Sequence, residues 1–103
     1  MEVITEIERN GTRFTVSFDS GEKIMLTRSL FYELGLTENM HCDLSELKKK
    51  ITVLQYRAGL NTAVAMLAQR ACSKGEIEQK LKNLHYLPDT IEMVLYKLER
   101  EGF

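Results

Sequence analysis

The C-terminal part of the chain, residues 60–102, contains three stretches in which apolar residues recur every three or four positions. This spacing is typical of one apolar helix face. The three faces comprise Leu60, Ala63, Val64, Leu67, Ala68 and Ala71, then Ile77, Leu81 and Leu84, then Ile91, Val94, Leu95 and Leu98. Because the links between the stretches are very short, we expect the three helices to pack as neighbours in one compact unit.

The ends of these stretches carry residues that favour helix termini. Ser73 and Glu76 have capping-box spacing, in which each side chain accepts a hydrogen bond from the other residue's backbone N–H. Pro88 suits a first helical position, and Asp89 suits the positive end of the helix dipole. Gly102 is placed to cap the third helix at its C-terminus.

Residues 1–42 predict a small antiparallel meander of three strands. The alternating residues are Val3, Thr5 and Ile7 in the first strand, Phe14, Val16 and Phe18 in the second, and Ile24 and Leu26 in the third. The dipeptide Asn10-Gly11 favours a hairpin turn because both residues accept positive φ. A meander this small needs a cover. We expect a short helix ending at Gly35 to supply it through Leu30, Phe31 and Leu34.

The stretch between the meander and the three-helix unit predicts a linking helix over residues 43–58. Asp43 and Glu46 have capping-box spacing at its start. Gly59 and Asn61 are weak helix formers, so we expect a kink or a break between Gln55 and Asn61. The predicted fold class is therefore α+β, with a β-meander and its covering helix in residues 1–42. A helical domain in residues 43–103 follows, with the three-helix repeat at about 60–102.

Composition narrows the class of protein. The chain has 103 residues, of which 28% are charged and 44% hydrophobic, as in an ordinary soluble domain. The net charge of −1 argues against a strongly basic nucleic-acid module. The apolar runs are too short to cross a bilayer. Glu2, Glu6 and Glu8 stand where a signal peptide would be basic, so we expect a cytoplasmic protein.

Few residues in the chain are suited to catalysis or metal binding. The soft metal ligands His41, Cys42, Cys72 and His85 lack zinc-site spacing, so we expect neither a metal nor a cofactor. The chain has no glycine-rich phosphate loop, and no Ser or Cys has an evident His partner in sequence. We therefore expect neither enzymatic activity nor a small-molecule substrate.

Basic residues offer a second kind of candidate site. Lys48-Lys49-Lys50 is the densest run, and the solvated face of a helix explains it best. Three short helices also permit a helix-turn-helix, in which the helix after Ser73 would read DNA bases. The exposed positions of that helix are Lys74, Glu78, Gln79 and Lys82. Their mixed charge disfavours base readout.

Residues 60–102 resemble the first helical repeat of the RecX family, the bacterial modulators of the RecA recombinase. The matching residues are Met66-Leu67-Ala68-Gln69-Arg70, Ser73, Glu76-Ile77, Lys80-Leu81, Ile91, Val94-Leu95, Leu98 and Gly102. Gly75 replaces a better helix former, and His85-Tyr86 replaces the usual Gly-Phe, so that turn can have a different backbone. Residues 1–42 resemble the β-rich N-terminal extension of longer RecX proteins.

The resemblance implies a non-catalytic regulator of recombination and DNA repair in the SOS response. Such proteins bind the RecA–DNA filament through tandem three-helix repeats and inhibit RecA. We expect Arg70, Lys74, Lys80 and Lys82 to face that partner, since they lie off the predicted apolar faces. The family normally continues beyond Gly102, which favours an N-terminal fragment. Two alternatives remain open: a nucleic-acid-binding helical domain acting alone, and an interaction module that binds no nucleic acid.

Overall fold

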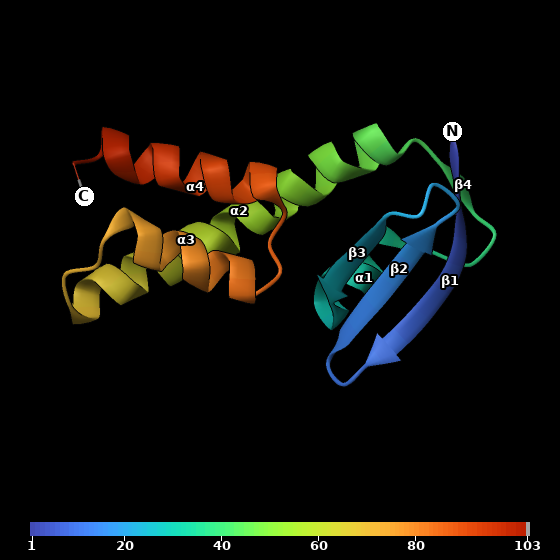
Figure 1. The fold of residues 1–103 in the computed structure, drawn as a ribbon, viewed down its shortest axis with the longest axis horizontal. Coiled ribbons are helices and arrows are strands. Elements are labelled where there is room, and N and C mark those ends of the chain that lie inside the picture. The colour runs from blue at the N-terminus through green and yellow to red at the C-terminus, as the bar shows by residue number, and fades with distance from the viewer. Residues whose placement is uncertain (103) are drawn as a thin grey trace. The chain divides into compact units, whose positions relative to one another are not determined.

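The computed structural model describes residues 1–102, which contain four strands and four helices (Figure 1). This arrangement confirms the predicted α+β class. The chain divides into two compact units, residues 1–48 and 49–103, and the last residue, Phe103, lies outside the described part. Helix α2 (Leu44–Gln69) begins in the first unit and ends in the second.

The first unit is built on an antiparallel sheet with the strand order β3-β2-β1-β4. Strands β1 (Glu2–Asn10), β2 (Arg13–Phe18) and β3 (Lys23–Thr27) form the predicted meander. The fourth strand, β4 (His41–Cys42), pairs with the start of β1 and was not predicted. Two residues are too few to show an alternating pattern, so only the tertiary pairing reveals this strand.

Strand β1 differs from its predicted alternation because it contains a β-bulge. Ile4 pairs with Phe18, whereas Glu6 pairs with Ser17, so one extra residue lies between the two pairs. The extra residue, Thr5, reverses the alternation beyond it. Ile4 and Ile7 therefore share the face that carries the buried side chains of β2, and Ile4 is fully buried. The predicted series of Val3, Thr5 and Ile7 on one face is wrong.

The core of the first unit follows the prediction for β2 and β3. In the covering helix only Phe31 is buried, whereas Leu30 and Leu34 are half-buried. Helix α1 (Arg28–Leu34) ends at Gly35, whose φ of 63° gives the left-handed conformation that glycine adopts readily. The Phe31 ring stacks on the Phe14 ring, with centroids 4.1 Å apart and an interplanar angle of 7°. The other buried apolar residues of this unit are Ile4, Val16, Phe18, Ile24, Leu26, Leu36, Leu44 and Leu47.

The start of α2 is held by carboxylates of the first unit. Asp43 Oδ1 accepts hydrogen bonds from the backbone N–H groups of Ser45 (3.0 Å) and Glu46 (3.3 Å), as expected of an N-cap. Glu2 Oε1 accepts another from the N–H of Leu44 (3.0 Å). These bonds satisfy donors that a helix N-terminus leaves without partners.

Helix α2 is unbroken where the sequence predicted a kink or a break between Gln55 and Asn61. Gly59 explains why the helix continues through this region. It is buried, and a Cβ atom at this position would lie 3.2 Å from Val94 Cγ2. Glycine costs about 1 kcal/mol of helix propensity, but here it lets α2 approach α4 (Pro88–Arg100) closely.

A buried glutamine joins the same part of α2 to the start of α4. Gln55 Oε1 accepts hydrogen bonds from the Leu87 backbone N–H (3.1 Å) and from the Thr90 hydroxyl (2.8 Å). Leu87 is the N-cap residue of α4, and its apolar side chain cannot accept a capping bond. Gln55 therefore supplies, from another helix, part of the cap that the local sequence lacks.

Helices α3 (Lys74–Asn83) and α4 lie side by side and pack with the C-terminal half of α2 (Figure 1). The buried core of this unit consists of Ala63, Ile77, Leu81, Ile91, Val94, Leu95 and Leu98. Leu60, Leu67 and Tyr86 are partly buried against it. The predicted face of the first helix is only partly correct, because Val64 is 42% exposed and Ala68 and Ala71 are exposed.

The link between α3 and α4 places a histidine in a left-handed conformation. His85 has a φ of 64°. Its N–H donates to the Lys82 carbonyl (3.0 Å), and the Tyr86 N–H donates to the Leu81 carbonyl (3.2 Å). These two bonds define a Schellman motif, in which glycine usually occupies the position of His85. The turn therefore keeps a glycine-type backbone although the glycine itself is absent.

We predict that Gln55→Leu lowers the free energy of unfolding by about 2–3 kcal/mol, because it leaves a partly buried N–H and a buried hydroxyl without an acceptor. Urea denaturation measures this loss. Thr90→Val removes one of the two donors, so the double variant should lose less stability than the sum of the single variants. Additive losses would contradict the shared hydrogen bond.

We predict that His85→Gly raises the free energy of unfolding by about 0.5–1 kcal/mol, because a left-handed residue with a Cβ costs about 1–2 kcal/mol and the entropy of glycine offsets part of the gain. His85→Ala is the matched control, since it keeps the Cβ and should bring no gain. A lower urea midpoint for His85→Gly would show that the imidazole itself stabilises the turn.

Candidate functional site

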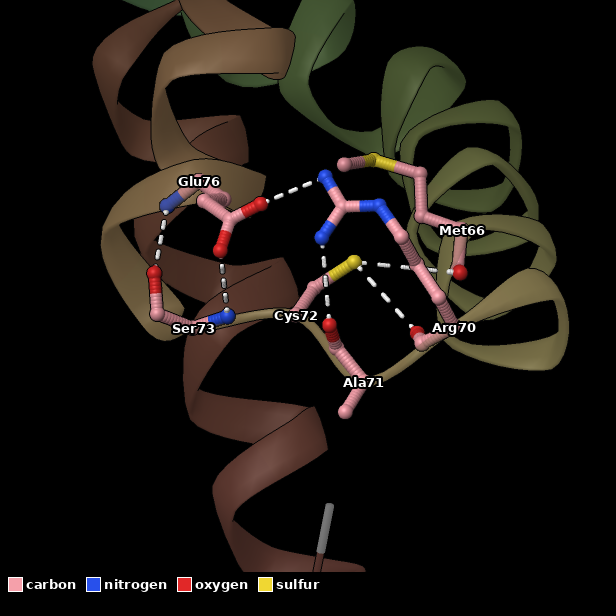
Figure 2. Close-up of polar contacts among 6 residues, drawn as sticks. All are labelled: Met66, Arg70, Ala71, Cys72, Ser73 and Glu76. Carbon is pink, nitrogen blue, oxygen red and sulfur yellow. Dashed lines mark hydrogen bonds and ion pairs between the residues drawn. The ribbon is translucent and has the colours of Figure 1, made fainter.

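The connection between α2 and α3 carries the first of the predicted partner-facing residues, and Glu76 organises it (Figure 2). Ser73 Oγ accepts from the Glu76 N–H (3.1 Å), and Glu76 Oε1 accepts from the Ser73 N–H (3.3 Å). The predicted capping box is confirmed. The second carboxylate oxygen, Oε2, accepts from Arg70 Nη2 at 2.6 Å. One side chain thus closes the α3 N-terminus and holds the end of α2.

Arg70 and Glu76 shift each other's protonation equilibria. The hydrogen bond from Arg70, followed by the bond from the Ser73 backbone, lowers the pKa of the Glu76 carboxyl. The same contact, viewed from Arg70, raises the pKa of its guanidinium. Arg70 also donates from Nη1 to the Ala71 carbonyl (3.2 Å). Its guanidinium is therefore engaged in fixing the turn, although the side chain is largely exposed.

Cys72 lies inside this connection and contacts backbone oxygens. Its Sγ is 3.5 Å from the Arg70 carbonyl oxygen and 3.8 Å from that of Met66 (Figure 2). The thiol is partly buried against the core of the helical unit. These contacts describe a thiol that packs at a helix end, and both Cys72 and Cys42 are unbridged.

Two of the predicted lysines also lie near carboxylates. Lys74 Nζ is 3.6 Å from Glu99 Oε1 on α4, and Lys82 Nζ is 3.9 Å from Glu78 Oε2 one turn earlier on α3. All four side chains are largely exposed, so each pair contributes little to stability. The pairs nevertheless reduce the positive potential that a partner would meet.

Lys80 differs from the other three residues. Its side chain is exposed and makes no hydrogen bond or ion pair within residues 1–102. At about 100° per residue, it projects about 120° away from Lys74 and about 160° away from Lys82 around α3. The structure therefore brings Arg70 to the start of α3 but does not gather the four residues into one continuous basic patch.

The exposed side of α3 is also unsuited to reading DNA bases. Gln79 Nε2 donates to Asn83 Oδ1 (2.9 Å), and Lys82 pairs with Glu78. A recognition helix would have to break these contacts and present Glu78 to an acidic groove. These contacts disfavour the helix-turn-helix interpretation.

Neither a metal site nor a membrane span can be identified in the described residues. Across residues 1–102, no group of three His, Cys, Asp or Glu side chains is arranged to hold a metal ion. The helices of this part of the chain are too short or too polar to cross a bilayer.

A surface that the sequence analysis missed lies where α2 meets the start of α4. A cleft of about 370 Å³ is lined by Lys49, Thr52, Val53, Asp89, Glu92 and Met93. Val53 is 70% exposed and Met93 is 43% exposed. Exposed apolar side chains are common singly, and here two of them line the same cleft. We call this feature the α2–α4 cleft.

No family model matches the chain. Among curated proteins it is similar to the "Regulatory protein RecX" of Streptococcus gordonii, with 25% identity over 100 residues. The match covers 97% of this chain and 39% of that protein. The predicted resemblance to the RecX family is confirmed. A solved structure titled "Crystal structure of regulatory protein RecX" aligns with 18% identity and a TM-score of 0.48, over 99% of this chain and 51% of that one.

The comparison with RecX covers both units of the chain. It includes the sheet unit, so the resemblance is not confined to the helical repeat. The chain spans about two fifths of the length of the curated RecX relative, which its name describes as a regulatory protein.

We predict that acid removes the stabilising effect of Glu76. Its pKa is lower in the folded than in the unfolded chain, so the stabilisation is present above the ordinary glutamate pKa of about 4.3 and is lost as the pH falls through the folded pKa. At pH 7, Glu76→Gln should have the lower urea midpoint. The difference between the two midpoints should shrink as the pH falls toward 3.

Glu78→Gln is the control for this comparison, because the longer 3.9 Å contact with Lys82 should give a smaller difference at pH 7. A Glu76→Gln difference that stays constant between pH 7 and pH 3 would contradict the assignment.

Proposed function

We propose that this chain is a non-enzymatic regulatory protein of the RecX type that binds the RecA–DNA filament in the bacterial cytoplasm. By occupying the filament it modulates RecA, limits strand exchange and acts in recombination, DNA repair and the SOS response. The observation that carries the proposal is the sequence similarity to RecX over 97% of the chain. The chain covers 39% of that relative, so its own contribution is one part of the regulatory activity.

The helical unit offers a binding surface rather than a reaction centre. The side chains of Gln55, Ser73 and Glu76 accept hydrogen bonds from backbone groups at helix N-termini and hold the helices in place. Lys74 and Lys82 of α3 are exposed, and each lies near a carboxylate that is itself at the surface. Such an arrangement suits reversible contact with a charged macromolecule and is consistent with a non-catalytic role.

Within the proposed site, Lys80 and Lys82 are the residues most available to the filament. Lys80 makes no side-chain contact within residues 1–102, and the Lys82 pair is long at 3.9 Å. Arg70 and Lys74 act mainly by steering, because each must leave a carboxylate to make a new bond. Charges of this kind speed association more than they tighten the final complex. The chain should therefore bind weakly and in a salt-dependent way.

We predict that Lys80→Glu/Lys82→Glu weakens binding of this chain to RecA–DNA filaments about tenfold at low salt, because both reversals replace an attraction to the negatively charged filament with a repulsion. It should also flatten the salt dependence of binding. Fluorescence anisotropy of the labelled chain, titrated with preformed filaments at several salt concentrations, measures both effects.

The matched control is Lys50→Glu/Arg57→Glu, which makes the same change in charge at exposed positions of α2. It should bind as the unaltered chain does. Equal affinity and equal salt slope for the Lys80/Lys82 variant would remove these two lysines from the proposal. Binding to DNA alone that equals binding to the filament would instead favour a nucleic-acid-binding domain. Binding to neither would favour an interaction module without nucleic acid.

A further inference from the structure

The outermost face of α4 carries four exposed residues in a regular row. Asp89, Met93, Tyr96 and Arg100 are separated by four, three and four positions, so they lie along one side of the helix. At about 100° per residue, this side is opposite to the one formed by the buried Ile91, Val94, Leu95 and Leu98. We call these four residues the α4 row.

The centre of the α4 row is apolar and unusually exposed. Tyr96 is 61% exposed and Met93 is 43% exposed. Tyrosine, methionine and arginine are the residue types enriched in protein–protein interfaces. The Arg100 guanidinium lies 5.8 Å from the centre of the Tyr96 ring, so the two side chains form one continuous surface.

The α2–α4 cleft adjoins the row at Met93 and provides a space that a partner can fill. Val53 forms its other apolar wall. Thr52, which also lines the cleft, is 6% exposed, and its hydroxyl has no hydrogen-bond partner among the described residues. A buried polar atom without a partner is uncommon in folded proteins. The cleft is therefore partly apolar, and it contains a hydroxyl that has no hydrogen-bond partner among the described residues.

The charges of the α4 row make it complementary to itself. Asp89 lies at its N-terminal end and Arg100 at its C-terminal end. When a second α4 runs antiparallel to the first, with the two-fold axis between Met93 and Tyr96, each Asp89 faces the Arg100 of the other copy. Each Met93 then faces a Tyr96, so that both ends and the centre match at the same time. Isologous interfaces require this kind of self-complementarity.

We propose that the α4 row is a homodimer interface, in which a second copy of this chain docks antiparallel and its Tyr96 enters the α2–α4 cleft beside Val53 and Met93. The helix dipole alone accounts for an acid at the start and a base at the end of α4. It does not account for the exposed Met93 and Tyr96 between them or for the exposed Val53 on α2, which the second copy covers.

The proposed dimer has a small area of contact. Helix α4 has 13 residues and is about 20 Å long, so one pair of such helices buries less than the roughly 1,600 Å² of a standard interface. The dimer is accordingly weak, and it forms at concentrations in the high micromolar range. Removal of a central side chain such as Tyr96 then lowers the affinity of the dimer by a large factor.

Sedimentation equilibrium of the whole chain over a concentration series tests the interface. The unaltered chain should show a reversible monomer–dimer equilibrium, and Tyr96→Ala should weaken it by at least about tenfold, as expected for a hot-spot aromatic residue. Tyr96 is largely exposed, so the variant should keep its helical circular dichroism and its urea midpoint. A chain that stays monomeric at all concentrations up to about 1 mM, where millimolar affinity would be visible, would overturn the proposal.

A charge exchange tests the antiparallel register. Asp89→Lys places a lysine opposite Arg100 of the second copy, and Arg100→Glu places a glutamate opposite Asp89, so each variant alone should dimerise less. An equimolar mixture of the two variants restores opposite charges at both ends and should form heterodimers. Glu33→Lys on α1 is the charge-matched control and should dimerise normally. Failure of the mixture to associate, or dimerisation untouched by either single reversal, would show that a different surface pairs.

Discussion

The helical unit depends on how its two short links satisfy the polar groups at the ends of three helices. Between α2 and α3 the bonds are local, because Ser73 and Glu76 cap each other and Arg70 joins the same carboxylate. Between α3 and α4 they are not, because Gln55 supplies the acceptor for the Leu87 N–H from α2. A helix end without such acceptors would carry unsatisfied buried groups. The positions of the three helices are therefore fixed by polar contacts as well as by the apolar core.

The predictable parts of this fold are those whose signal is local in the sequence. The capping box needs only Ser73 and Glu76 at the right spacing, and the buried faces of β2 and β3 follow from strict alternation. The bulge at Thr5 was not predictable, because one extra residue in a strand leaves no mark on composition. The continuity of α2 depends on Gly59 meeting Val94 and on Gln55 meeting Leu87, which are contacts between residues distant in sequence.

The candidate partner site also depends on contacts between residues that are distant in sequence. The sequence identified exposed basic residues correctly, since Arg70, Lys74, Lys80 and Lys82 all lie at the surface. It could not identify their neighbours. The pairing of Lys74 with Glu99 depends on how α3 lies against α4, and the sharing of Glu76 between Arg70 and the capping box depends on the path of the link. Which charges remain available to a partner is a property of the tertiary structure.

The two proposed surfaces use different sides of the helical unit. The proposed filament contacts lie on the exposed flanks of α3, whereas the proposed dimer interface is the side of α4 opposite to its buried residues. Charge reversal at Lys80 and Lys82 therefore leaves the α4 row intact, and Tyr96→Ala leaves α3 intact. In the proposed dimer both copies keep α3 exposed, so a repeating filament would meet two linked surfaces. Linkage of this kind raises the effective concentration of the second contact, which offsets the weakness of each single one.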